Sequence, residues 1–340
     1  MTTVRPSRDN IPIVTLADIR DAQACLRGIA VRTCLLESRI HQAGSTDPRR
    51  LYLKPENQQP IGAFKLRGAY NKIASLTEDE RRRGVISYSS GNHAQGVAYA
   101  ARALGTKAVI VMPKNAPAIK REATAALGAE IVLVGPSSDE RMRRAEELAV
   151  QHGYVIVPPY DDEKIIAGQG TIGLEILEDL PGVETVLVPV GGGGMISGVA
   201  TALKLSKPSV RVIGVEPELA ADAQASLRAG KIVQFSAEQV TQTLADGLRT
   251  TSIGANNFEH IRRYVDDIIT VTENEIQEAM ACLAQDPRSI AEPSGAVAVA
   301  GFLFHRAELP ETKMNVAVIS GGNIEPAMLA EIRAGARVAD

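Results

Sequence analysis

The sequence has little cysteine, little net charge and no long apolar run. Its three cysteines, Cys25, Cys34 and Cys282, are scattered and form no CxxC pair, which argues against disulfides or a cysteine metal site and predicts reduced thiols. Lys and Arg number 37 against 40 Asp and Glu, so the basic excess typical of nucleic-acid binders is missing. No apolar run approaches the ~20 residues of a membrane-spanning helix, and MTTVRPSRDNIPIVTL contains no signal-peptide core. We expect a cytoplasmic protein with neither a nucleic-acid nor a membrane partner.

From about residue 84 the chain alternates short β-rich runs with longer helical patterns. The first series has expected strands at 84–89, 107–112, 130–134 and 154–157, with helices at 94–104, 116–127 and 139–152. The second has strands at 184–190, 210–215 and 315–319, with helices at 195–205, 273–284, 294–304 and 325–334. Such series form parallel sheets covered on both faces. We expect an α/β protein with two parallel-sheet domains, a small inserted domain (76–161) and a large domain (1–75 with 162–340).

Four consecutive glycines, Gly191-Gly192-Gly193-Gly194, follow one expected strand and precede a helix. They let successive N–H groups converge in front of a helix N-terminus, which favours an anion. The alternative is a flexible turn. The run matches neither GxxxxGK[ST] nor GxGxxG, so a small monophosphate suits it better than ATP or NAD. A second turn, Ser320-Gly321-Gly322-Asn323, also follows a strand and could face the same crevice, or be ordinary turn chemistry.

Two further segments carry candidate chemistry. Lys65 has mostly apolar neighbours (PIGAFKLRGA), and burial lowers the pKa of a lysine toward the neutral amine that Schiff-base formation requires. Alternatively, its ammonium reaches solvent from a helix start. Ser89-Ser90-Gly91-Asn92-His93 precedes a helix and suits a carboxylate, or forms an N-cap cluster. His93 there is compatible with a structural role alone.

Glu216 and Asp222 place two carboxylates six residues apart around a turn that follows a strand. Oxygen ligands suit Mg²⁺, Mn²⁺ or Ca²⁺. The alternative is a solvated acidic loop.

Together these segments resemble the threonine/serine dehydratase and serine racemase family, which are fold-type II (tryptophan synthase β-like) enzymes that use pyridoxal 5'-phosphate. The resemblance runs from about residue 11 to 329. It is carried by GAFKLRGA at 62–69, SSGNHAQG at 89–96, GGGGM at 191–195, EP at 216–217, ADG at 245–247, EPSGA at 292–296 and SGGN at 320–323.

The resemblance implies roles for these residues. Cofactor contacts would come from Lys65 (Schiff base), Phe64 (beside the ring), Asn92 (3'-oxygen), Gly191, Gly192, Gly193, Gly194 and the Met195 amide (phosphate), and Ser320 (pyridine nitrogen). The substrate carboxylate would meet Ser89, Ser90, Asn92 and His93. Racemase-like members use the residue matching Ser90 as a second catalytic base beside the lysine. They also bind a divalent ion through the positions of Glu216, Asp222 and the Ala220 carbonyl.

The implied activity is dehydration and deamination of L-threonine or L-serine to a 2-oxo acid and ammonia. A serine at position 320 leaves the pyridine nitrogen largely neutral, which suits prompt loss of a β-hydroxyl. Alternatives are a dehydratase of 3-hydroxyaspartate or a β-aryl serine, an amino-acid racemase with side dehydratase activity, or an idle cofactor-binding protein. The chain has IGAFK where the family usually has TGSFK, so substrate preference stays open. We expect a homodimer, and no C-terminal regulatory domain before Asp340.

Overall fold

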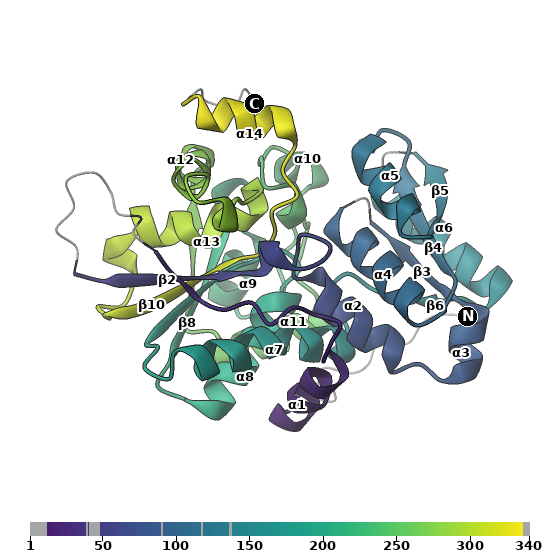
Figure 1. Ribbon diagram of the computed structural model, residues 1–340, viewed down its shortest axis with the longest axis horizontal. Coiled ribbons are helices and arrows are strands. Elements are labelled where there is room, and N and C mark those ends of the chain that lie inside the picture. The colour runs from purple at the N-terminus through teal and green to yellow at the C-terminus, as the bar shows by residue number, and fades with distance from the viewer. Residues whose placement is uncertain are drawn as a thin grey trace.

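The computed structural model describes residues 12–335 apart from 39, 41–47, 90, 117 and 136–137. Within these residues the strands form one sheet of six and one of four (Figure 1). Apart from β1, every strand pairs in parallel with its neighbours. The expected α/β fold class with two parallel-strand sheets is therefore confirmed. Ser90 lies outside the described residues, so its expected roles remain predictions.

The smaller sheet has the order β5-β4-β3-β6 and follows the first predicted series closely. Its strands are β3 (Val85–Tyr88), β4 (Ala108–Pro113), β5 (Glu130–Val134) and β6 (Val155–Ile156). Its connecting helices are α4 (Asn92–Ala103), α5 (Ala118–Ala126) and α6 (Ser138–His152). Alternate residues of β4 face opposite sides, because Ile110 packs with α4 whereas Val109 and Val111 pack with α6.

The larger sheet has the order β1-β2-β10-β7-β8-β9. Its strands are β1 (Leu36–Ser38), β2 (Arg50–Pro55), β7 (Thr185–Pro189), β8 (Arg211–Pro217), β9 (Asp267–Val271) and β10 (Met314–Ile319). The helices of this part are α1 (Leu16–Cys25), α2 (Lys65–Ala74), α7 (Glu163–Asp179), α8 (Gly194–Ser206), α9 (Asp222–Ala229), α10 (Ala237–Val240), α11 (Ala255–Tyr264), α12 (Glu273–Leu283), α13 (Pro293–Phe304) and α14 (Pro326–Arg333). Helix α3 (Glu78–Arg83) packs on β6 of the smaller sheet. The sequence did not predict β1, β2, β9 or α7.

Helices cover both faces of the larger sheet, as the near-continuous apolar strands predicted. On β10, Val316 and Val318 pack against the layer of α7, α8 and α11. Ala317 and Ile319, one residue out of phase, pack against the layer of α12 and α13. Each face therefore has its own apolar core, with β10 and β7 in the middle of the sheet.

Helix α2 joins the two parts of the molecule because it packs against both α4 and α7 (Figure 1). The approach to α7 is close: a Cβ at Gly168 would lie 2.7 Å from the carbonyl oxygen of Arg67. Glycine is therefore required there to bring the backbones together. This packing holds the N-terminus of α2, where Lys65 is the first residue, between the two sheets.

Among the described residues, no helix combines the length and apolar character needed to cross a membrane. Cys25, Cys34 and Cys282 are free thiols, as the sequence predicted.

Candidate active site

Both glycine-rich turns lie at the same edge of the larger sheet. The glycine run at 191–194 follows β7, and the turn at 320–323 follows β10. Strands β7 and β10 are parallel neighbours, with Ala317 opposite Leu187, so their carboxyl ends are adjacent. The two turns therefore lie side by side at the carboxyl edge of the sheet, the usual ligand position in open α/β sheets.

The glycine run accepts no larger side chain in this arrangement. Gly193 has a φ of 94°, and Gly194 opens the 13-residue helix α8. A Cβ at Gly191 would lie 3.1 Å from the Cα of Leu248, and one at Gly192 would overlap the ring of Tyr160. The first backbone N–H groups of α8 have no acceptor within the helix, which is the arrangement that a phosphate site uses.

Lys65 lies beside the turn that follows β10. The amide of Phe64 donates to the carbonyl of Ser320 at 3.1 Å, and Ala63 pairs with Gly321. The Lys65 Nζ donates to the carbonyl of Pro159 at 2.8 Å and lies 5.1 Å from the centre of the Phe64 ring. Burial of this nitrogen lowers the pKa of Lys65 to about 8, although part of the side chain remains exposed. The neutral amine is therefore a minority at pH 7, but far more abundant than for an ordinary lysine.

The amide of Asn92, the first residue of α4, is held from both ends. Its Nδ2 donates to Oε1 of Glu292 at 2.6 Å, and its Oδ1 accepts a hydrogen bond from Nδ2 of Asn323 at 2.7 Å. An amide nitrogen carries two protons, so one donor is left for a ligand. Burial and, to a smaller extent, the charge of Asp246 raise the pKa of Glu292 to about 7, although the hydrogen bond from Asn92 lowers it.

Ser320 is buried at the end of β10, with 4% of its surface exposed. Its Oγ donates to the carbonyl of Ser294 at 3.2 Å, and Oγ of Ser294 accepts from the amide of Gly247 at 2.9 Å. These bonds connect the three motifs SGGN, EPSGA and ADG. A hydroxyl that can also accept a hydrogen bond is therefore fixed at the carboxyl end of β10.

The polar turn after β3 is less open to a ligand than the sequence suggested. His93 is buried, and its Nε2 lies 3.1 Å from the carbonyl of Val157. Burial and the nearby charge of Lys65 lower the pKa of His93 to about 3, so the ring is neutral. Its Nδ1 has no hydrogen-bond partner in the described part of the chain. Oγ of Ser89 accepts from the amide of Gly91 at 3.3 Å.

Glu216 and Asp222 form a buried carboxylate pair at the end of β8, next to β7. Glu216 accepts from the amides of Ala223 (3.0 Å) and Gln224 (2.8 Å), whereas neither oxygen of Asp222 has a well-aligned partner among the described residues. Burial raises the pKa of Asp222 to about 7, offset partly by the amides of Asp222 and Ile253. Burial and the charge of Asp222 raise the pKa of Glu216. Two uncompensated buried carboxylates fit a divalent cation.

Within the described residues there is no cluster of three or more His, Cys, Asp or Glu side chains able to hold a metal. A site at Glu216 and Asp222 would therefore need carbonyl or water ligands.

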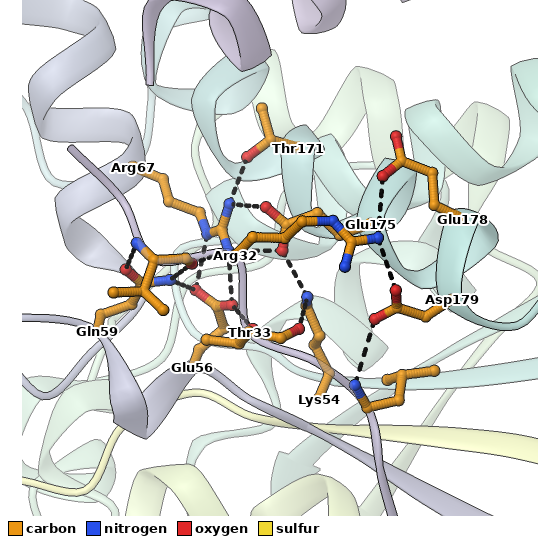
Figure 2. Close-up of polar contacts among 12 residues, drawn as sticks. Arg32, Thr33, Lys54, Glu56, Gln59, Arg67, Thr171, Glu175, Glu178 and Asp179 are labelled. Carbon is orange, nitrogen blue, oxygen red and sulfur yellow. Dashed lines mark hydrogen bonds and ion pairs between the residues drawn. The ribbon is translucent and has the colours of Figure 1, made fainter. Parts of the chain in front are cut away.

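A buried ion network supports the lysine-bearing helix (Figure 2). Arg67, two residues after Lys65, contacts Glu56 at 2.7 Å and Glu175 at 2.7 Å, and Glu175 also pairs with Lys54 at 2.5 Å. Arg67 is 1% exposed and Glu56 is fully buried. The network thus joins β2, α2 and α7 directly behind the N-terminus of α2.

Sequence reasoning missed several residues of this site. Glu292 lies in the EPSGA motif, and the glutamate before the apolar run PSGAVAVAG is a signal for a buried charge that the sequence analysis did not use. Asn323 lies in SGGN, where no pattern predicts its contact with Asn92. Nothing in the sequence marked Tyr160, whose ring lies against Gly192.

A lysine with a lowered pKa and a glycine run at a helix start, both near the carboxyl ends of parallel strands, are the arrangement expected of an enzyme that binds a phosphorylated carbonyl compound. Residues 31–321 match the family described as pyridoxal-phosphate dependent enzyme, and the chain belongs to this family. It is 46% identical over 320 residues to the L-threonine ammonia-lyase of Thermotoga maritima, covering 94% of this chain and 78% of that protein.

Two solved structures are similar over nearly their whole length. A threonine deaminase from T.th. has 42% identity and a TM-score of 0.85, covering 92% of this chain and 99% of that one. Maize serine racemase has 36% identity and a TM-score of 0.89, covering 94% and 97%. The resemblance seen in the sequence, and the fold-type II architecture that it implied, are confirmed.

Proposed function

We propose that the protein is a pyridoxal-phosphate-dependent ammonia-lyase that converts L-threonine or L-serine to a 2-oxo acid and ammonia. The observation that carries this proposal is the position of Lys65, whose neighbour Phe64 bonds to Ser320 and whose Nζ bonds to Pro159, one residue before the Tyr160 ring that lies on Gly192. The lowered pKa of Lys65 makes this amine partly neutral. The relatives named as L-threonine ammonia-lyase and threonine deaminase support the same activity.

The residues present fit the cofactor. The glycine run and the Met195 amide would hold its phosphate, because the run is free of side chains and lies at the start of α8. Asn92 would donate its remaining N–H to the 3'-oxygen, and Ser320 would meet the pyridine nitrogen. Phe64 would pack beside the ring. When bound, pyridoxal phosphate supplies the electron-accepting ring that makes the Cα–H bond of an amino acid acidic.

Lys65 would hold the cofactor covalently and then serve as the base that takes the α-proton of the substrate. Its pKa near 8 suits both tasks, since the neutral amine is available at neutral pH. The carbonyl of Pro159 would orient the freed amine, because it accepts from Nζ at 2.8 Å. Loss of the α-proton and the β-hydroxyl yields water and an unsaturated amine, which hydrolyses to the 2-oxo acid and ammonia.

The substrate carboxylate would bind at the turn of Ser89, Ser90 and Asn92. We keep His93 in this group as a neighbour of the carboxylate. Its neutral ring donates from Nε2 to the Val157 carbonyl, so Nδ1 is an acceptor and would reach the carboxylate through a bridging water. Ser90 would act as a base on the opposite face of the substrate, which favours serine racemisation as a second activity. The similarity to maize serine racemase supports this candidate.

Glu216, Asp222 and the carbonyl of Ala220 would hold a divalent ion, most simply Mg²⁺. The unpaired oxygens of Asp222 support this assignment. The ion would neutralise two buried carboxylates and stabilise the fold without taking part in the reaction.

We also propose that residues 76–161 form a small domain and residues 1–75 with 162–340 a large cofactor-binding domain, and that the protein is a cytoplasmic homodimer. The four-stranded sheet within residues 85–156 supports the first assignment. Light scattering of the purified protein tests the dimer.

Borohydride reduction followed by peptide mapping tests the proposed function. The reduced cofactor should be found on Lys65, and a label on another lysine would refute the assignment. Lys65→Ala should lose 2-oxo acid production by several orders of magnitude, because covalent binding and proton transfer disappear together. Assay of D- and L-hydroxy amino acids, with both 2-oxo acid and enantiomer ratio measured, distinguishes dehydratase from racemase.

A further inference from the structure

The segment Pro159–Asp162 connects β6 to α7. Almost every residue of this segment contacts a different part of the site. The carbonyl of Pro159 accepts from Nζ of Lys65 at 2.8 Å. Asp162 caps α7 through the amide of Lys164 at 2.8 Å, and pairs with Lys72 of α2 at 2.6 Å. These contacts fix the segment before and after Tyr160.

The ring of Tyr160 lies directly against the glycine run. A Cβ at Gly192 would overlap three ring carbons of Tyr160, and one at Gly194 would lie 3.0 Å from its Cα and Cβ. Gly192 and Gly194 thus present bare backbone to a single aromatic residue. This contact covers one side of the run with a rigid, apolar surface.

The carbonyl of Gly192 is held by α11 and its N-cap, and Asp161 holds the start of α11 in turn. The carbonyl of Gly192 accepts from the amide of Gly254 at 3.1 Å and from Nδ2 of Asn257 at 2.8 Å. Asp161, adjacent to Tyr160, accepts from the amides of Ala255 (3.1 Å) and Asn256 (2.9 Å) at the start of α11. Gly192 is therefore held by the ring of Tyr160 and by helix α11, and Asp161, the residue after Tyr160, binds the start of that helix.

We propose that Tyr160 is a positioning residue for the cofactor phosphate: its ring holds the glycine run in the shape that binds the anion. A run of four glycines has large conformational freedom when nothing packs on it, and ordering it on binding would weaken affinity. The ring removes that freedom beforehand. This inference rests on the proposed function, in which residues 191–194 bind the phosphate.

The ring, rather than the hydroxyl, supplies the effect. Burial, followed by the charges of nearby Tyr88, Asp161 and Asp222, raises the pKa of Tyr160, so the phenol stays neutral. Tyr160→Phe keeps the ring and is therefore the matched control for Tyr160→Ala.

The test compares binding of pyridoxal 5'-phosphate and of pyridoxal, which lacks the phosphate, to the apoenzyme by absorbance titration. Tyr160→Ala should raise the Kd for pyridoxal phosphate about tenfold while changing that for pyridoxal less than about twofold. Tyr160→Phe should resemble the wild type for both. An equal loss for both ligands in Tyr160→Ala, or no loss for either, would overturn the proposal.

The same titration separates this proposal from the one on which it rests. A wild type that binds pyridoxal as tightly as pyridoxal phosphate would refute the phosphate site itself. A wild type that prefers the phosphate, with Tyr160→Ala keeping that preference, would refute only the role of Tyr160.

A double mutant checks the contact even if Tyr160→Ala loses stability. Gly192→Ala should lower the melting temperature of the apoenzyme strongly in the wild type, because its Cβ meets the ring. In the Tyr160→Ala background the same substitution should cost much less, because the ring is gone. Equal costs in both backgrounds would show that the ring does not restrain Gly192, against the proposal.

Discussion

Arg67→Met tests how far the lysine-bearing helix depends on a buried charge. The side chain contacts Glu56 and Glu175 at 2.7 Å each, and its exposed fraction is 1% (Figure 2). Methionine replaces the aliphatic stem but not the guanidinium and carries no charge, so the substitution leaves Glu56 buried without the cation that contacts it. Lys54 still pairs with Glu175, so most of the lost stability comes from the unpaired charge of Glu56.

The expected cost is about 3–5 kcal/mol of unfolding free energy, the range for breaking a buried ion pair from one side. A charge pair about 4 Å apart at an effective dielectric constant of about 20 gives a similar value, about 4 kcal/mol. This is a large share of the ~5–15 kcal/mol that stabilises a typical protein. Urea unfolding of the apoenzyme, followed by circular dichroism, measures it. Glu56→Gln is a milder variant for use if Arg67→Met does not fold.

Arg50→Met is the matched control. Arg50 pairs with Glu37 at the same 2.7 Å, but the two side chains are 52% and 56% exposed. An exposed pair contributes about 0–1 kcal/mol, so the control should change the unfolding free energy little. If both arginine variants lose the same stability, burial does not set the strength of the Arg67 network and the reasoning fails.

The penalty of Arg67→Met should also depend on pH. Burial raises the pKa of Glu56, but the charge and hydrogen bonds of Arg67 outweigh it and lower the pKa overall. That contribution is present above the unfolded carboxylate value of about 4.3 and is lost as pH falls through the folded pKa. In the variant, burial without the cation raises the pKa of Glu56. The difference between variant and wild type should therefore shrink toward acidic pH.

Three further predictions concern other parts of the chain. Ser90→Ala should abolish racemisation and D-isomer elimination while largely sparing L-isomer elimination, measured by chiral chromatography; equal loss of both would favour a carboxylate-binding role. Chelator should lower the melting temperature and Mg²⁺ should restore it, and Glu216→Ala should remove this response; a wild type indifferent to both would argue against the ion. Burial lowers the pKa of His305, but hydrogen bonds with Glu308 and Glu275 outweigh burial and raise the pKa overall. The stability that His305 adds to the fold is therefore fully present below about pH 6.5 and is lost as the pH rises through the folded pKa. His305→Asn should therefore lower the melting temperature more at about pH 5.5 than at about pH 8.5; a constant difference would contradict this.

The sequence by itself determined the elements whose signals are local. Strands such as β4 and β10 are continuous apolar runs, and a run of four glycines between a strand and a helix is typical of an anion site. Lys65 stood out because an amine among apolar neighbours has an energetic cost. Helix α7 was missed because Gly168, Gly170 and Gly173 weaken the local helical signal. Their function is tertiary, since they let α7 approach α2 and α8 closely.

Only the tertiary structure decided which distant residues meet. Asn92 bonds to Glu292, 200 positions away, and its amide orientation depends on that contact. The ring of Tyr160 lies on Gly192 because the connection from β6 to α7 passes over the glycine run. Neither contact has a local pattern, because each joins a residue that follows a strand of the smaller sheet to a residue of the larger part. The residues with candidate chemistry could therefore be predicted from the sequence, whereas the contacts that position them follow from the packing of the two sheets around α2.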